Sequence, residues 1–400
     1  MSDIAIVLGR GIEGCGVTKY TVELESWLLQ KGHSVTIYSP KDKKWSRNDV
    51  HELKNLVHVR FDKDEFDQVY EGCKKSDLMI VISLPSVGHS EKCRDNFLKL
   101  LDLSIQKVSI QLDHYLASLK RNLCLYESVK NVDLVFALST TGAFSEYVKS
   151  NVDTEGSLST FWGDEEVKKT IHGTQAAVDF ASYKKYIKPI SEQDERHHKW
   201  IGRTARWKGY GLMIDFHNGH LSRLDHMTTI EGIDRSPVYM EVKDKYSFKE
   251  EIKTNIEDCD LSNRYGELAS LFGIYNNSEL LERMSLCGYG YQLSILEPHM
   301  IGSHLEFTHL ETIAVGAIPV FRKEYGDACI HRYYKKPLTE LESGTIWLSE
   351  NNMEECLDTI KKLSEDHKMR EEYREMAQHC YSWYDSKYVF EDLFKVINGA

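Results

Sequence analysis

Hydrophobic runs alternate with amphipathic stretches from the start of the chain. The apolar run Ile4–Leu8 predicts a buried strand, and in Val17–Lys31 the apolar positions recur at helical spacing until Gly32 ends the pattern. Ser34–Tyr38 then predicts a second strand. Because the crossover between two such strands is right-handed, they are expected to be parallel neighbours. The first segment of the chain therefore predicts a strand–helix–strand unit of a parallel sheet.

The alternation continues along the chain and returns in its second half. Further strands are predicted at Leu78–Ile82, Val108–Leu112, Leu134–Leu138, Trp200–Gly202, Met227–Ile230, Ala317–Phe321 and Gly344–Leu348. Helices are predicted at Lys92–Leu101, Leu119–Lys130, Ser278–Ser285, Leu310–Val315 and Met353–Leu363, with two more between Asp366 and Ile397. Strands that alternate with helices in this way are typical of doubly wound α/β domains.

The periodic pattern weakens between residues 150 and 195, where Pro189 precedes the polar stretch Ser191–His198. Polar segments that contain proline commonly link domains. We therefore predict an α/β protein of two Rossmann-like, doubly wound domains facing a cleft. The first domain comprises residues 1–192 and is joined by the C-terminal helix 381–400, and the second comprises residues 193–380.

Composition narrows the class of protein. The chain has 400 residues and is 41% hydrophobic, which allows a buried core and excludes a disordered or fibrous chain. No apolar run approaches the roughly 20 residues of a membrane span, and Met1–Ile4 lacks the features of a signal peptide. The nine cysteines form an odd number without CxxC pairs, which favours reduced structural thiols over disulfides or a zinc ribbon. We expect a cytosolic protein without a membrane partner.

The net charge of −12 argues against binding nucleic acid through overall charge. Basic residues nevertheless gather locally. Five Lys or Arg and no acid lie between Arg196 and Gly209, and smaller groups occur at Lys41–Arg47 and Lys120–Arg121. A single group of this kind is usually a solvated surface, so each is only a candidate anion site.

A glycine-rich loop follows the first predicted strand, with Gly9, Gly11, Gly14 and Gly16 close together. Between a strand and a helix, such a loop presents backbone N–H groups and lets a ligand approach closely. The spacing does not match the dinucleotide fingerprint, and Tyr38 stands where that fingerprint places an acid. No Gly-Lys-Ser/Thr completes a P-loop. We predict a ligand-binding loop, with a tight turn as the structural alternative.

Charged residues follow the first strand of the second predicted domain. Arg203 and Lys208 lie where the carboxyl end of that strand meets the expected cleft, the usual ligand position in open α/β sheets. An Arg and a Lys there can hold a diphosphate from two sides, and this position favours such a clamp over the alternative of a basic surface linker. Glu306 and Glu311 lie at a predicted helix, where a carboxylate can accept two hydroxyls of a ribose or a sugar, or interact with the helix dipole.

Two similar α/β domains, the Arg203 and Lys208 clamp, and a Leu-Glu helix followed by Gly-x-x-Pro-Val resemble the GT-B nucleotide-sugar glycosyltransferases. In that fold the last helices cross back to the first domain, and the C-terminal pattern here resembles that ending. Retaining members with a Glu-x7-Glu motif place one acid eight residues before the other. Here that position is Ser303, so the division of roles between Glu306 and Glu311 stays open.

Several strings narrow the resemblance to the T-even bacteriophage DNA α-glucosyltransferases. They are Gly11–Lys19, Trp200–Thr204, Trp207–Gly209, Gly288–Ser294 and Thr308–Glu311. The resemblance implies retaining transfer of a sugar, glucose or a pentose such as arabinose, from a UDP-sugar to the hydroxymethyl group of 5-hydroxymethylcytosine in double-stranded phage DNA. It implies a monomer in the cytoplasm of the infected bacterial host, where the modification protects DNA from restriction. No cofactor is required beyond the donor, and a divalent metal is left without assigned ligands.

The patterns and the resemblance together give the candidate site residues. Those for the donor are Gly14, Gly16, Arg203, Lys208, Gln292, Glu306, Thr308, His309 and Glu311. Those for catalysis are Asp113 and His114, in a string that matches the family except at Leu112, where a second histidine is expected. A helix cap is the structural alternative for Asp113. Those for DNA are Lys19, Lys43, Lys44, Arg47, Lys120 and Arg121.

Two other functions stay open. A GT-B transferase could act on a saccharide or a small acceptor, which the acidic charge favours over DNA. A non-catalytic protein that recognises modified bases needs the basic groups but no diphosphate clamp. Asp62-Lys63-Asp64 has the Asp-x-Asp form of a metal site in another glycosyltransferase fold, but its setting favours a solvated loop, as does that of Asp258-Cys259-Asp260.

Overall fold

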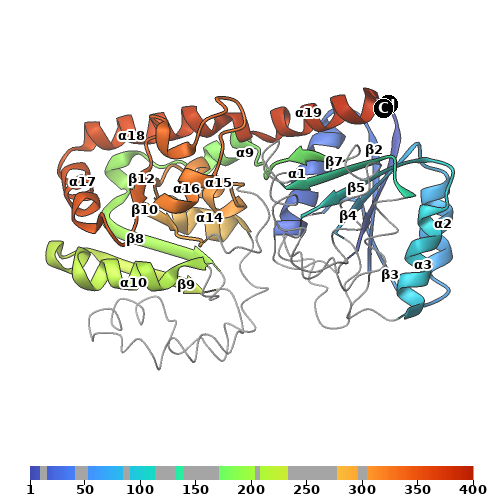
Figure 1. The fold of residues 1–400 in the computed structure, drawn as a ribbon, viewed down its shortest axis with the longest axis horizontal. Helices are drawn as coiled ribbons and strands as arrows, with labels where there is room; N and C mark the ends of the chain where they lie inside the picture. The colour runs from blue at the N-terminus through green and yellow to red at the C-terminus, as the bar shows by residue number, and fades with distance from the viewer. Residues whose placement is uncertain are drawn as a thin grey trace, which may run out of the picture. The chain divides into compact units, whose positions relative to one another are not determined.

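The structure is a computed structural model. It describes residues 1–9, 16–40, 53–83, 91–112, 131–138, 171–202, 208–232, 277–295 and 304–399. The chain forms two compact units (Figure 1). The first unit holds Met1–Ala177, Pro298–His304 and Ser386–Ala400, and the second holds Val178–Glu297 and Leu305–Asp385.

The boundary between the units lies earlier than the predicted one at residues 192–193. The segment from Val178 onward packs with the second unit, because the backbone N–H of Val178 bonds to the carbonyl of Tyr384 at 3.3 Å. Arg374 also donates to the carbonyl of Lys188 at 2.7 Å. Both bonds tie this segment to the end of the second unit before the chain returns to the first.

A seven-stranded parallel sheet forms the centre of the first unit. Its strand order is β3-β2-β1-β4-β5-β6-β7. The strands are β1 (Asp3–Leu8), β2 (Ser34–Pro40), β3 (Leu56–Val59), β4 (Leu78–Ile82), β5 (Gln106–Gln111), β6 (Leu134–Leu138) and β7 (Ile171–Thr174). The direction of winding reverses between β1 and β4, the position at which open α/β sheets bind their ligands.

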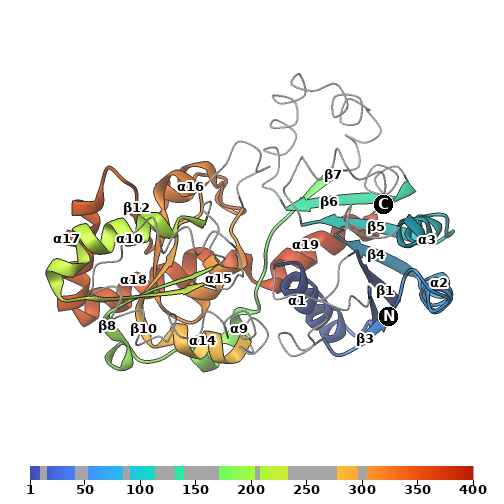
Figure 2. The same cartoon turned by 90° about the horizontal axis from the view of Figure 1, so that it is seen from below.

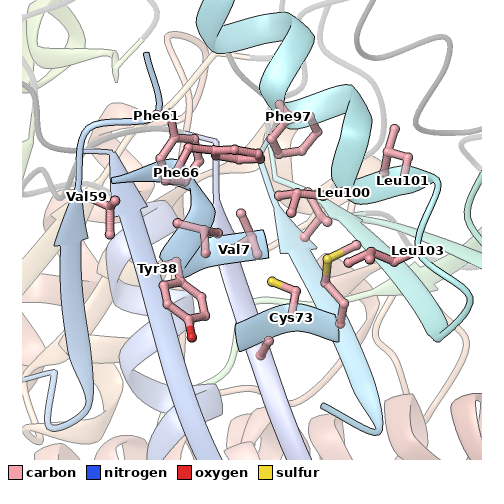
Figure 3. Close-up of a cluster of buried hydrophobic side chains, with 14 of the residues drawn as sticks. Val7, Tyr38, Val59, Phe61, Phe66, Cys73, Phe97, Leu100, Leu101 and Leu103 are labelled. Atoms are coloured by element: carbon pink, nitrogen blue, oxygen red, sulfur yellow. The ribbon is translucent and has the colours of Figure 1, made fainter. Parts of the chain in front are cut away.

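Helices cover both faces of this sheet. Figure 2 shows α1 (Gly16–Gln30) and α19 (Ser386–Gly399) on one face, with α2 (Phe66–Lys74) and α3 (Glu91–Leu101) on the other. On the α2 and α3 side, a buried cluster fills the space above β1, β2 and β4 (Figure 3); its larger members include Tyr38, Phe61, Phe66, Phe97 and Leu100. On the α1 side, aromatic rings of α1 pack against the C-terminal helix α19: the ring centroids of Tyr20 and Phe390 are 5.3 Å apart.

A five-stranded parallel sheet forms the centre of the second unit, in the order β12-β11-β10-β8-β9. Its strands are β8 (Asp194–Gly202), β9 (Met227–Gly232), β10 (Cys287–Gln292), β11 (Ile318–Arg322) and β12 (Ile346–Leu348). Its longer helices are α10 (Tyr210–Gly219), α14 (Asn277–Ser285), α15 (Phe307–Ala314), α17 (Met353–Glu365) and α18 (His367–Tyr381), with the short helices α9 (Phe180–Tyr183) and α16 (Lys323–Ala328). Side chains of α10 and α17 form one buried cluster with the sheet.

The two sheets confirm the predicted α/β fold class. Most predicted elements are present within a few residues, and β4 and β6 have the predicted bounds. The predicted helix Leu119–Lys130 lies outside the described residues. The hydrophobic pattern alone did not indicate β7, α10 or β10, which are short or rich in glycine and polar residues.

The interpretation of Ser191–His198 as a polar linker is wrong, because β8 already begins at Asp194. His198 is fully buried in this strand. Its ring nitrogens make hydrogen bonds with Tyr291 and His226, both at 2.8 Å. These partners allow a polar side chain in a sheet interior, which a pattern of hydrophobic residues cannot reveal.

The cysteines of the described residues are free and buried, as expected of structural thiols; they are Cys73, Cys93, Cys287, Cys329, Cys356 and Cys380. Burial raises the pKa of the Cys73 thiol to about 12, which keeps it protonated and unreactive. Within the described ranges, no helix is long and apolar enough to span a membrane.

Gly209, the residue before α10, provides a test of this fold. Its φ is +72°, and a Cβ there would lie 1.8 Å from the carbonyl oxygen of Leu293. Gly209→Ala should therefore cost more than the roughly 1–2 kcal/mol of a left-handed alanine and lower the melting temperature by several degrees. Gly219→Ala is the matched control, because a Cβ at Gly219 meets nothing within 4 Å. Equal melting temperatures for the two variants would contradict this account.

Candidate active site

An ion pair at the carboxyl edge of the second sheet joins two residues that are distant in sequence. Lys208 lies between β8 and α10, and Glu306 is the residue that caps the N-terminus of α15. The Lys208 ammonium pairs with a carboxylate oxygen of Glu306, and the two side chains are only 14% and 18% exposed. Low exposure strengthens the attraction and makes either charge costly when it is left alone. The two charges therefore compensate each other in this structure.

Two further groups hold Glu306 in place. The hydroxyl of Ser294, which follows β10, donates to Glu306 Oε1 at 3.1 Å. The backbone N–H of Glu306 donates to Nδ1 of His309 at 3.3 Å. A carboxylate at this position also interacts favourably with the dipole of α15. The carboxylate is thus fixed by an ammonium, a hydroxyl and a helix terminus.

His309 is a neutral, fully buried histidine beside this pair. Its ring stacks on Tyr325, with centroids 5.2 Å apart, and meets the ring of Phe321 edge-on at 4.5 Å. Burial lowers the pKa of His309 to about 4; Glu306 opposes this shift and Lys208 adds to it. Because Nδ1 accepts the hydrogen bond from Glu306, the proton of the neutral ring is on Nε2. Nε2 is buried without a hydrogen-bond partner among the described residues, so it presents an unused N–H donor.

Glu311 supplies a second carboxylate farther along α15. It is 5% exposed, and its Oε1 accepts a hydrogen bond from the hydroxyl of Tyr183 at 3.2 Å. Tyr183 is the last residue of α9, and Asp179 caps that short helix by accepting the backbone N–H of Ala181 at 3.0 Å. The second unit therefore orients two carboxylates on one helix through different partners.

The remaining described candidates have structural contacts. Gln292 is buried at the end of β10, and its amide donates to the carbonyl of Ile201 at 3.2 Å, which ties together the ends of two neighbouring strands. Thr308 is half-buried in the first turn of α15, and its carbonyl accepts the hydroxyl of Thr312 at 2.7 Å. Gly16 begins α1.

The structure places Lys19 away from solvent. Its side chain is buried, and its ammonium lies 3.4 Å from a carboxylate oxygen of Glu23 on the next turn of α1. A residue that binds DNA phosphate must expose its charge, so the role predicted for Lys19 requires a change at this helix. The other candidates lie outside the described residues; they are Gly14, Lys43, Lys44, Arg47, Asp113, His114, Lys120, Arg121 and Arg203.

Sequence reasoning did not single out two residues of this site. Ser294 ends a string that matched the family, but a serine after a strand carries no distinctive signal. Tyr183 lies in the stretch where the periodic pattern weakens, and nothing near it in sequence points to Glu311. Only the tertiary structure brings both hydroxyls to the carboxylates of α15.

Metal-binding groups of three or more His, Cys, Asp or Glu side chains are absent from the described part of the chain. In the Asp-x-Asp string, the carboxylate of Asp62 lies 3.3 Å from the guanidinium of Arg60. Both side chains are more than one-third exposed, as expected of a surface loop. The string Asp258–Asp260 lies outside the described residues.

A cation, two oriented carboxylates and a buried N–H donor at the carboxyl edge of a parallel sheet suit a ligand that carries both phosphate and hydroxyl groups. Together with the two-sheet architecture, they define a nucleotide-sugar glycosyltransferase of the GT-B fold. A family model described as DNA alpha-glucosyltransferase matches residues 15–368. The chain belongs to the DNA α-glucosyltransferase family.

Individual relatives agree with this assignment. The chain is 37% identical over 399 residues to the DNA alpha-glucosyltransferase of Enterobacteria phage T4, covering 98% of this chain and 99% of the relative. A solved alpha-glucosyltransferase in complex with UDP-glucose and DNA containing an abasic site is 34% identical, with a TM-score of 0.83 and 99% of each chain covered. An alpha-glucosyltransferase in complex with UDP is 33% identical, with a TM-score of 0.82 and full coverage of both chains. The predicted family, fold class and enzyme class are confirmed.

The buried state of His309 predicts a pH dependence. Its pKa is about 4 in the folded protein and near 6.5 when it is unfolded, so the unfolded state takes up the proton first as the pH falls. Stabilisation from the neutral ring is complete above pH 6.5 and is lost toward pH 4, with a loss of about 2 kcal/mol at pH 5. Glutamine does not take up a proton in this range, so the free energy of unfolding of His309→Gln lacks this loss. The difference in the free energy of unfolding between the wild type and the variant should therefore be smaller at pH 5 than at pH 7.5. Urea unfolding at both pH values measures this, and parallel pH profiles would rule it out.

Proposed function

We propose that this enzyme transfers glucose, with retention, from UDP-glucose to the hydroxymethyl group of 5-hydroxymethylcytosine in double-stranded DNA. The observation that carries the proposal is the group of Lys208, Glu306, His309 and Glu311 at the edge of the second sheet, in a chain of this family. One solved relative contains UDP-glucose and DNA together, which supports the same two partners here. The biological setting that we propose is the cytoplasm of an infected bacterial host, where the modification protects phage DNA from restriction.

The donor binds mainly to the second unit. Lys208 exchanges the carboxylate of Glu306 for the diphosphate, and Arg203 holds the same group from the other side. Glu306, once released, stays anchored to Ser294 and accepts hydroxyls of the transferred sugar. His309 donates through Nε2–H to the donor, and Glu311 accepts the ribose hydroxyls. The diphosphate thus takes the place of the carboxylate at Lys208, and the hydroxyl of Ser294 and the dipole of α15 continue to stabilise the released carboxylate.

The first unit supplies the acceptor side. A hydroxymethyl group within a duplex cannot reach a buried anomeric carbon, so the cytosine is flipped out of the helix. Asp113, which follows β5, accepts the proton of the acceptor hydroxyl or stabilises the positive charge that develops on the sugar. Lys208 and Arg203 stabilise the diphosphate leaving group as its negative charge grows.

Transfer assays test this proposal directly. DNA duplexes with 5-hydroxymethylcytosine or with cytosine are incubated with UDP-glucose or UDP-arabinose and examined by mass spectrometry. We expect a mass increase of one hexose on the hydroxymethylated duplex with UDP-glucose and none on the cytosine duplex. Transfer only from UDP-arabinose would change the donor sugar to the pentose alternative. Transfer to neither duplex from either donor would refute the acceptor assignment.

The role of Asp113 gives a second test. Asp113→Asn keeps the shape of the side chain but removes its charge, so transfer should fall by about 100-fold or more, as for loss of a general base. UDP-glucose and DNA should bind within about twofold of wild-type affinity, since this residue acts on the reacting atoms. Asp62→Asn, at an exposed aspartate paired with Arg60, is the control and should transfer normally. A wild-type transfer rate for Asp113→Asn would show that Asp113 is not catalytic and would favour the alternative of a helix cap.

A further inference from the structure

Tyr183 is a buried tyrosine whose hydroxyl donates a hydrogen bond to Glu311. The side chain is 3% exposed, and Oη donates to Glu311 Oε1 at 3.2 Å. The two residues are 128 positions apart in the sequence. The contact therefore depends on the packing of α9 against the rest of the second unit rather than on any local feature of α15.

The short helix α9 is itself well anchored. Asp179 accepts the backbone N–H groups of Ala181 and Ser182 at 3.0 and 3.3 Å, which fixes the first turn. Just before it, Val178 forms a parallel bridge with Asp385 and bonds to the carbonyl of Tyr384. The tyrosine hydroxyl is consequently presented from a rigid segment, which is the condition for orienting another side chain.

A glutamate needs such help because its three side-chain torsions leave the carboxylate free to rotate. Holding one oxygen of Glu311 with a hydrogen-bond donor fixes the plane of the carboxylate before any ligand arrives. The cost of ordering is then met in folding rather than in binding, which increases affinity for a ligand that requires that orientation. The vicinal hydroxyls of a ribose are such a ligand, because both must meet one carboxylate.

We propose that Tyr183 is a positioning residue for ribose recognition: it orients Glu311 so that the carboxylate accepts the 2′- and 3′-hydroxyls of the donor's uridine. This inference rests on the proposed function, in which Glu311 binds the ribose. It adds a residue that does not touch the reacting atoms and that selects ribonucleotide over deoxyribonucleotide donors.

The test compares UDP with 2′,3′-dideoxyuridine diphosphate by isothermal titration calorimetry. In the wild type, UDP should bind at least tenfold more tightly than the dideoxy analogue. Tyr183→Phe should weaken UDP binding about five- to tenfold, the worth of one oriented hydrogen bond, and the analogue less than twofold. The KM for UDP-glucose should rise by a similar factor with kcat nearly unchanged, because Tyr183 acts on binding alone.

Tyr186→Phe is the matched control, since Tyr186 lies in the next turn and its ring packs 6.2 Å from that of Tyr183. Its hydroxyl makes no hydrogen bond within the described part of the chain, so both ligands should bind as in the wild type. In a Glu311→Ala background, Tyr183→Phe should have no further effect on either ligand. Melting temperatures identify any variant that fails to fold. The comparison of UDP with the dideoxy analogue in the wild type needs no variant, so it tests the inference in any case.

Each contrary result has a distinct meaning. Equal weakening of UDP and the analogue in Tyr183→Phe would make Tyr183 a packing residue only. Equal wild-type binding of the two ligands would show that no group reads the ribose hydroxyls and would overturn the inference while leaving transfer from UDP-glucose intact. Failure of the wild type to bind UDP would overturn the inference and the donor assignment together.

Discussion

The ion pair between Lys208 and Glu306 is the interaction on which the donor site that we propose depends. It connects the loop after β8 with the N-terminus of α15, two segments 98 positions apart, and it is mostly shielded from water. A pair of this kind adds little net stability but strongly penalises the loss of either partner. It therefore keeps a cation and an anion together at the edge of the sheet where we propose that an anionic ligand binds. In the donor complex that we propose, the diphosphate replaces the carboxylate at Lys208, and Ser294 and the terminus of α15 still hold Glu306 in place.

Around this pair, the second unit surrounds its carboxylates with buried polar groups whose hydrogen bonds are nearly all assigned. Ser294 donates a hydrogen bond to Glu306, and Tyr183 donates one to Glu311. The hydrogen bond from Gln292 to Ile201 joins the ends of β8 and β10. His309 Nε2 differs from them, because it is fully buried without a partner among the described residues. An unsatisfied buried donor costs stability, which is why we assign this N–H to the donor ligand in the proposed function. The stability of this unit and its chemistry thus place opposite demands on the same few residues.

The sequence was most informative where hydrophobic strands and helices repeat regularly. β4 and β6 are continuous apolar runs, and β1 and β11 are apolar except for one charged residue at an end. The alternation of such runs with helices predicted both sheets. It was least informative for strands whose burial depends on partners elsewhere. β8 begins in a run of charged and histidine residues, and it can bury His198 because that ring makes hydrogen bonds with Tyr291 and His226. β10 contains glycines because a Cβ at Gly290 would lie 2.3 Å from the side chain of Thr312 in α15. Such strands are specified by their neighbours rather than by their own periodicity.

For the site, the sequence by itself determined which charges follow which strands. Because parallel strands end at one edge of a sheet, Lys208 could be expected at that edge after the predicted strand Trp200–Gly202. The acids of α15 follow β10, a strand that the hydrophobic pattern did not indicate. The resemblance of short strings to a known family added the chemistry. What only the tertiary structure decided is how these groups are paired: that Lys208 meets Glu306, that Tyr183 reaches Glu311, and that Lys19 is turned to Glu23. Pairing depends on side-chain directions and burial to within an ångström, and these are set by the packing of elements far apart in the chain, which no local pattern records.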